Sequence, residues 1–161
     1  MGRIFEGGTS GAGLRIAIVR TRWNEFVVDR LFAGAKDALR RAGVAEASVD
    51  VATAPGAYEV PFVARKLAET GRYDAIVALG CVIRGETAHF DYVAGEAARG
   101  IAAVAHDTGV PATFGVLTVD TMEQAIDRAG GKAGNKGAEA ALAAIELADL
   151  ARSIRESGHV G

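Results

Sequence analysis

The chain has 161 residues, a formal net charge of −2 at pH 7, 50% hydrophobic residues and a single cysteine. This length fits one domain that buries a core without disulfides, so we expect a single domain over residues 1–161 that begins with an arm over residues 1–13. The charge balance excludes a generally basic surface, so no nucleic-acid partner is expected. The lone Cys81 excludes an internal disulfide framework and fits a reducing compartment, so we expect a cytoplasmic protein.

No segment of the sequence is typical of export or of membrane insertion. The first residues, Met-Gly-Arg-Ile-Phe-Glu, lack the apolar region of about 7–15 residues that marks a secretory signal. No apolar run approaches the roughly 18 residues of a spanning helix, so no membrane partner is expected. The 21 glycines and the many alanines predict a core of small side chains in which backbones approach closely.

Short β-rich runs alternate along the chain with longer runs whose apolar residues recur at helical spacing. Strands are predicted over residues 14–19, 48–53, 75–80 and 112–118. Helices are predicted over residues 24–42, 58–69, 91–108 and 138–155, with a short helix between Thr121 and Gly130. Gly43 stands where a helix C-terminus favours glycine, and Glu123 and Gln124 are placed for a capping box after Thr121.

This alternation predicts an α/β fold with parallel strand pairing through right-handed crossovers. The expected architecture is a three-layer α/β/α sandwich around a mainly parallel four-stranded sheet, as in flavodoxin-like folds. Every loop from a strand to the next helix then lies at one sheet edge, where ligands bind in open α/β sheets. The loops that carry the candidate site are residues 20–24, 54–59, 81–89 and 118–121.

The first two loops hold groups suited to binding a ring and a polar edge. Trp23, the only tryptophan, has a π-face that suits either stacking on a heterocycle or packing at a helix start. The loop Pro-Gly-Ala-Tyr-Glu over residues 55–59 allows close main-chain approach, and free N–H groups at a helix start bind polar ligand edges. Glu59 also complements the dipole of the following helix, so a structural role stays open.

The third loop, Arg-Gly-Glu-Thr-Ala-His-Phe over residues 84–90, is the richest in polar residues. A glycine and a threonine just before a helix N-terminus predict an anion site, because dipole and backbone N–H groups point outward. His89 follows closely, and imidazole titrates near neutral pH, where proton transfer is most effective. A merely solvated histidine is the alternative.

Other parts of the sequence do not fit a known phosphate-binding or metal-binding motif. The glycine-rich stretch 130–137 lacks both the Lys-Ser/Thr ending of a phosphate loop and a preceding strand. Cys81 has no Cys or His at ligand spacing, so no metal site is expected. His106 and His159 are interpreted as surface residues.

Five blocks of the sequence carry a resemblance to a known family. They are Pro-Gly-Ala-Tyr-Glu-Val-Pro (55–61), Gly-Cys-Val-Ile-Arg-Gly-Glu-Thr-Ala-His-Phe-Asp-Tyr (80–92), Phe-Gly-Val-Leu-Thr (114–118), Gln-Ala-Ile-Asp-Arg-Ala-Gly (124–130) and Lys-Ala-Gly-Asn-Lys-Gly (132–137). In order and without evident gaps from about Gly11 to Ile154, the chain resembles the 6,7-dimethyl-8-ribityllumazine synthase family.

The resemblance implies a transferase of riboflavin biosynthesis that uses neither cofactor nor metal. It would condense 5-amino-6-(D-ribitylamino)uracil with 3,4-dihydroxy-2-butanone 4-phosphate to 6,7-dimethyl-8-ribityllumazine, with His89 as the catalytic acid–base residue. The residues implied to bind the ribitylaminouracil are Trp23, Ala57, Tyr58, Glu59, Cys81, Val82, Ile83 and, from a neighbouring subunit, Phe114. The residues implied to bind the butanone phosphate are Glu86, Thr87, Arg128 and Lys136.

The resemblance also implies assembly into pentamers, twelve of which often form a shell that encloses riboflavin synthase. The short link 132–137 resembles the shell-forming type, so we expect the 60-mer over the free pentamer. The arm residues Arg3 to Glu6 are a candidate to add a strand to a neighbour's sheet. Two rival functions stay open, namely a flavin-storing domain without catalysis and a purely structural shell protein.

Two positions depart from the pattern of the family. Cys81 stands where threonine is common, and Glu86 stands where a small residue is common. If both positions bind through backbone N–H groups, their side chains matter little. The carboxylate of Glu86 is still expected to weaken phosphate binding unless Arg84, Arg128 or Lys136 compensates.

Overall fold

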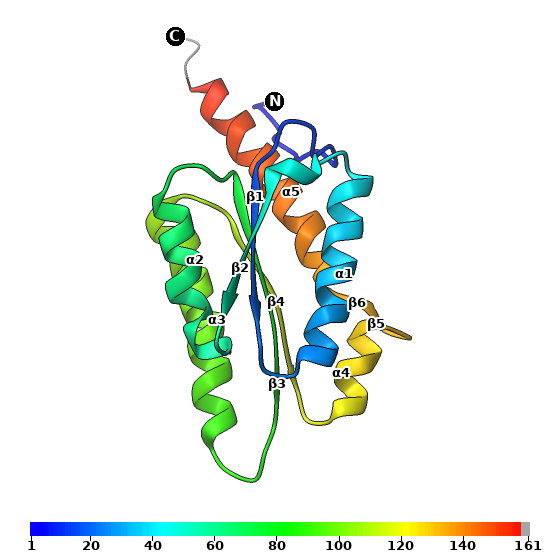
Figure 1. Ribbon diagram of the computed structural model, residues 1–161. Coiled ribbons are helices and arrows are strands. Elements are labelled where there is room, and N and C mark those ends of the chain that lie inside the picture. Colours follow the sequence, from blue (N-terminus) through cyan, green and yellow to red (C-terminus); the bar gives the residue numbers. More distant parts are fainter. Residues whose placement is uncertain (159–161) are drawn as a thin grey trace.

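Four strands form one parallel sheet in a computed structural model that describes residues 1–158 (Figure 1); His159 lies outside the described residues. The strands are β1 (Ile16–Thr21), β2 (Val49–Ala54), β3 (Ala75–Ile83) and β4 (Ala112–Val119). Their order is β2-β1-β3-β4, and each neighbouring pair is parallel. The predicted four-stranded parallel sheet is therefore confirmed.

Helices cover both faces of this sheet, as Figure 1 shows. One face carries α1 (Glu25–Arg41), α4 (Met122–Arg128) and α5 (Lys136–Ser157), and the other carries α2 (Val60–Glu69) and α3 (His89–Thr108). Two short 3₁₀ helices, Glu46–Ser48 and Ala57–Glu59, flank β2. The three-layer α/β/α sandwich predicted from the sequence is confirmed. No helix within residues 1–158 has the length and apolar character needed to cross a membrane.

Two apolar layers, one on each side of the sheet, make up the core. Along β1, Ile16 and Ile18 face α1 and α5, whereas Ala17 and Val19 face α2 and α3, and all four are fully buried. Burying one isoleucine side chain stabilises the fold by about 1.5–3 kcal/mol. Small residues close the layers, because a Cβ on Gly115 would lie 2.8 Å from the carbonyl oxygen of Ala78.

Two strands differ from their predicted bounds by two residues or more, and the other two differ by one residue at most at either end. The first strand begins at residue 16 and ends at residue 21, two residues later than predicted at each end. Strand β3 continues to Ile83 instead of ending at Gly80, because β4 continues beside it and pairs Cys81 with Leu117 and Ile83 with Val119. Three residues predicted in a loop are therefore held in the sheet, which fixes their backbone at the candidate site.

The predicted helices are confirmed, and their ends differ from the predicted ones by at most two residues, as in α3 and α5, which begin at His89 and Lys136. Gly43 adopts φ +94°, the left-handed conformation that ends α1. Before α4, the Gln124 N–H donates to Thr121 Oγ1, and the Gln124 side chain accepts from the N–H of Asp120 instead of Thr121. The glycine-rich stretch before α5 forms a small antiparallel hairpin of β5 (Ala129–Gly131) and β6 (Gly134–Asn135).

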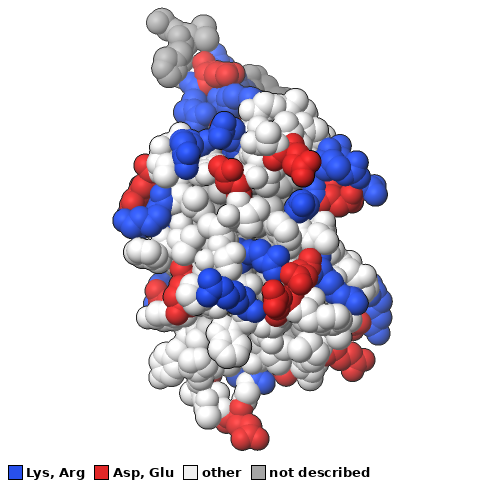
Figure 2. All heavy atoms as spheres, in the orientation of Figure 1, with Lys and Arg blue, Asp and Glu red and all other residues white. Residues whose placement is uncertain are grey.

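The N-terminal arm lies along α5 of its own chain. The N–H of Gly8 donates to Asp149 Oδ2 at 2.8 Å, and Arg3 Nη1 donates to the carbonyl oxygen of Ser157 at 3.0 Å. The hydrogen bond from Gly8 lowers the pKa of Asp149. On the face shown in Figure 2, Lys and Arg side chains are interspersed with Asp and Glu side chains.

Candidate active site

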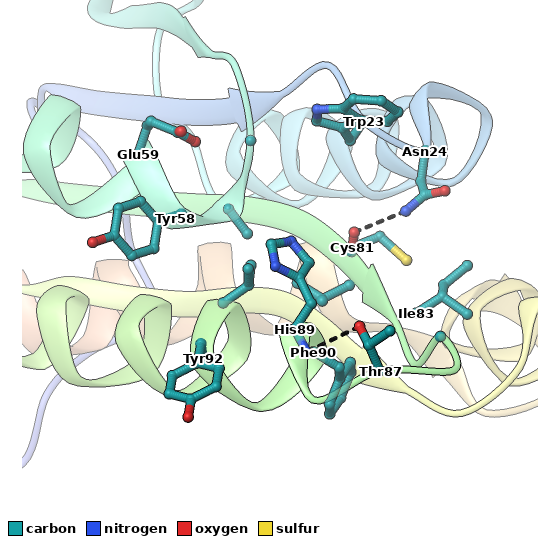
Figure 3. Close-up of a pocket in the computed structure, with 15 residues that line it drawn as sticks. Trp23, Asn24, Tyr58, Glu59, Cys81, Ile83, Thr87, His89, Phe90 and Tyr92 are labelled. Carbon is teal, nitrogen blue, oxygen red and sulfur yellow. Dashed lines mark hydrogen bonds between the residues drawn. The ribbon is translucent and has the colours of Figure 1, made fainter.

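A hollow of about 640 Å³ lies at the carboxyl edge of the sheet, on the side of α2 and α3. Its walls come from the segments after β1 and β2, the end of β3 and the first turns of α3 (Figure 3). This is the edge at which the sequence predicted the candidate site. The predicted site residues that line the hollow are Trp23, Ala57, Tyr58, Glu59, Cys81, Val82, Ile83, Thr87 and His89.

The indole of Trp23 is exposed and lies close to the backbone of Gly56. The side chain of Trp23 is 73% exposed, so it is not buried in the core at the start of α1. A Cβ on Gly56 would lie 3.3 Å from Trp23 Cδ1 and 3.1 Å from Glu59 Oε2. A side chain at this position would therefore crowd both groups, and glycine lets the ring and the carboxylate approach the loop closely. The exposed indole face favours stacking on a ligand over packing at the helix start.

Asn24 lines the hollow as well and was not predicted from the sequence as a site residue. Among the described residues it is the non-glycine residue with positive φ, at φ 57° and ψ 44°. Its carbonyl oxygen accepts the N–H groups of Val27 and Val28, which starts α1. Asparagine is among the few residues that adopt this conformation readily, so an Asn at a predicted helix start was the available signal.

The end of β3 forms a wall of mainly apolar groups. Cys81 is 3% exposed, and burial raises the pKa of its thiol to about 11. The thiol is therefore protonated at neutral pH and is a poor nucleophile. Val82 and Ile83 follow it along the wall. The wall thus offers shape and main-chain polar groups, and no activated sulfur.

His89 begins α3 and presents its imidazole to the hollow. Figure 3 shows the ring among the lining side chains, with Trp23 and Glu59 across from it. The N–H of His89 donates to Thr87 Oγ1 at 3.3 Å, which orients the loop before the helix. Tyr92 and Val93 also line the hollow and were not predicted to do so. Their positions three and four residues after His89 place them on the same helix face, and this spacing was the signal to use.

A family model described as 6,7-dimethyl-8-ribityllumazine synthase matches residues 13–152. The match spans every residue that lines the hollow. The chain belongs to the lumazine synthase family. The resemblance found in the sequence is thereby confirmed, and the family places the chain among the enzymes of riboflavin biosynthesis.

Four residues implied by likeness to the lumazine synthase family do not line the hollow of this chain. Glu86 is exposed in the loop before α3, and Phe114 is the third residue of β4, far from its carboxyl end. Arg128 ends α4 on the opposite face of the sheet, where its Nη1 donates to the carbonyl oxygen of Gln124. Lys136 begins α5 and is paired with Glu139 at 3.1 Å.

The charged residues that line the hollow limit the kinds of ligand group that a single chain can bind. Its lining includes no Lys or Arg within residues 1–158, and its one carboxylate belongs to Glu59. Among the same residues, no three His, Cys, Asp or Glu side chains are grouped to hold a metal ion. One chain therefore offers a ring-binding wall, a carboxylate and an imidazole, but no cation for a phosphate.

Proposed function

We propose that this protein condenses 5-amino-6-(D-ribitylamino)uracil with 3,4-dihydroxy-2-butanone 4-phosphate to give 6,7-dimethyl-8-ribityllumazine. The observation that carries the proposal is the convergence of an exposed indole, a carboxylate and an imidazole in one hollow, from Trp23, Glu59 and His89. Membership of the lumazine synthase family supports it. The reaction makes the protein a transferase, and we place it in the cytoplasm with the rest of the pathway.

The ribitylaminouracil fits the wall between Trp23 and the end of β3. Its flat pyrimidine stacks on the indole, and Ala57, Tyr58 and Glu59 bind its polar ribityl chain. The carboxylate of Glu59 accepts hydrogen bonds from ribityl hydroxyl groups. Main-chain groups of Cys81, Val82 and Ile83 bind the ring edge, because side chains there are largely apolar.

The chemistry consists of two condensations with an elimination between them. The 5-amino group attacks the ketone carbonyl and forms an imine with loss of one water. Phosphate then leaves with its bonding electrons after a proton is removed from the carbon skeleton. The ribitylamino nitrogen closes the ring on the carbonyl group that results, with loss of a second water. His89 carries protons in these steps, since a histidine side chain in the hollow can both accept and donate a proton.

The phosphate of the second substrate needs a cation that the lining of one chain does not provide. We place it at Thr87 and Glu86 of one subunit and at Arg128 and Lys136 of a neighbour. Phe114, which is 44% exposed on the edge strand, comes from that neighbour as well. The site is then complete only between subunits, and the family is oligomeric.

We propose a pentamer as the working unit, with twelve pentamers in a 60-mer shell that encloses riboflavin synthase. Light scattering and electron microscopy test the assembly. Five chains of 16.6 kDa give about 83 kDa, whereas sixty give roughly 1 MDa. A particle near 83 kDa alone contradicts the shell, and a monomer contradicts the shared site.

Mixing the purified protein with both substrates tests the reaction. We expect lumazine fluorescence to grow together with one inorganic phosphate per lumazine formed. A protein that arrives yellow but forms no product is a flavin-storing domain. A protein that forms no product and binds no flavin is a structural shell component.

A further inference from the structure

Arg84 joins three segments around the loop that precedes α3. It follows β3 directly, and its Nε lies 3.0 Å from Oδ1 of Asp120, in the turn between β4 and α4. Its Nη1 lies 3.3 Å from Oδ1 of Asp91, in the first turn of α3. The guanidinium also lies over the ring of Phe90, with Cζ 4.2 Å from the ring centroid. One side chain therefore holds both ends of the loop 85–88 and the adjacent strand end.

These contacts remove Arg84 from the groups that could offset Glu86. Donation to Asp120 raises the pKa of the guanidinium, and Asp91 raises it further. Two carboxylates surround one cation, so the local charge of the cluster is negative. A phosphate in the hollow thus gains little attraction from Arg84. From the sequence, Arg84 was a candidate cation to compensate for Glu86, and its ion pairs with Asp91 and Asp120 argue against that role.

The contacts of Arg84 fix geometry more than they add stability. The side chains of Arg84, Asp91 and Asp120 are 47%, 64% and 64% exposed. Ion pairs at such exposure contribute little free energy, because water screens them. The planar guanidinium, however, fixes the direction of each hydrogen bond and stacks on Phe90, which lysine cannot reproduce. Phe90 itself lines the hollow.

We propose that Arg84 is a positioning residue for the reaction, because it fixes the loop 85–88 and the start of α3 so that Thr87 and His89 face the hollow. The proposal rests on the proposed function for its kinetic consequence. The effect of Arg84 on the order of the loop is argued from its contacts and does not depend on the proposed function. The two parts are therefore measured separately.

Arg65 provides a matched control. Its Nε lies 3.1 Å from Glu69 and its Nη1 lies 3.0 Å from Asp107, so it also bridges two carboxylates. Its side chain is 45% exposed, close to the value for Arg84. It joins α2 to α3 without lining the hollow. Arg65→Lys therefore removes a guanidinium that bridges two carboxylates, as Arg84→Lys does, but at a place away from the hollow.

Amide hydrogen exchange and steady-state kinetics on the full-length assembly test the proposal. In Arg84→Lys, we expect amides of residues 85–90 to exchange several-fold faster than in the wild type. We also expect the KM for the butanone phosphate to rise roughly tenfold, while the KM for the ribitylaminouracil stays within about twofold. Asp120→Asn, which removes one of the two carboxylates, should give a smaller change of the same kind. Arg65→Lys should change neither measurement.

Unchanged exchange in Arg84→Lys overturns the proposal whatever the activity. Faster exchange with an unchanged KM overturns it too, because the order that Arg84 gives the loop then has no effect on the reaction. An equal rise in both KM values shows general damage to the fold and counts against it. If the wild type forms no lumazine, the proposed function fails, and the exchange data still decide whether Arg84 orders the loop.

Discussion

The side-chain amide of Asn24 donates a hydrogen bond to the carbonyl oxygen of Cys81 at 2.9 Å. This contact joins the segment after β1 to the end of β3, across the wall where the ribitylaminouracil is proposed to bind (Figure 3). The left-handed backbone of Asn24 turns the amide toward β3, while its carbonyl oxygen starts α1. One residue therefore ties the segment that carries Trp23 to the end of β3.

Asn24→Ala and Asn24→Gly separate the two contributions of this residue. Both lose the hydrogen bond, which contributes about 1 kcal/mol. Alanine also pays a steric cost of roughly 1–2 kcal/mol at positive φ, and glycine does not. We expect both to raise the KM for the ribitylaminouracil and Asn24→Ala to be the less stable in urea. Equal stability of the two variants would show that backbone strain is absent.

His89→Ala tests the proton-transfer role. We expect kcat to fall by roughly 10–10²-fold, at or below the usual range for acid–base catalysis. The loss is moderate because holding two reactive substrates together supplies much of the rate. His106→Ala is the control, since His106 is exposed in the last turn of α3. Wild-type turnover in His89→Ala would make His89 a bystander.

Arg128→Ala tests the origin of the phosphate-binding cation. We expect the KM for the butanone phosphate to rise about tenfold or more, since ionic hydrogen bonds to phosphate are the strong ones. The KM for the ribitylaminouracil should not change. Arg99→Ala is a control, because the Arg99 side chain is 81% exposed on α3. A change in the ribitylaminouracil KM alone would refute the phosphate role.

The thiol of Cys81 should resist alkylation. Burial raises its pKa from 9.0 to about 11, so its thiolate fraction at pH 8 falls by about a hundredfold. Iodoacetamide should therefore label the native protein at least that much more slowly than the urea-unfolded protein. Because the folded pKa is raised, the unfolding free energy should fall between about pH 9 and pH 11 in the wild type, and less in Cys81→Ala. Equal labelling rates would contradict the burial of the thiol.

The layers and the sheet were predictable because their signal is local. Apolar alternation and helical spacing are properties of short windows, and glycine at a helix end, as at Gly43, has a direct conformational cause. The end of β3 was not predictable in the same way. Ile83 is held in the sheet by its pairing with Val119, which lies thirty-six residues away in sequence.

Much of the hollow was also predicted, since most of its lining lies in the segments that the sequence predicted as strand-to-helix loops. Asn24 was missed because its role depends on a hydrogen bond to a distant carbonyl. The pairing of Arg84 with Asp120 was missed for the same reason, and so its charge was counted as available. Contacts between segments distant in sequence cannot be predicted from a single sequence. They determine which charged side chains are available to bind a ligand.

His89 and Arg128 lie on opposite faces of one sheet, so a site that uses both must draw them from two chains. Two variants that are each impaired at a different residue should then restore part of each other's activity. In the experiment, His89→Ala and Arg128→Ala chains are unfolded, mixed in equal amounts and reassembled. With random pairing, about a quarter of the interfaces contain a native His89 from one chain and a native Arg128 from its neighbour. Activity higher in the mixture than in either variant reassembled alone would show that each active site is formed at a contact between two chains.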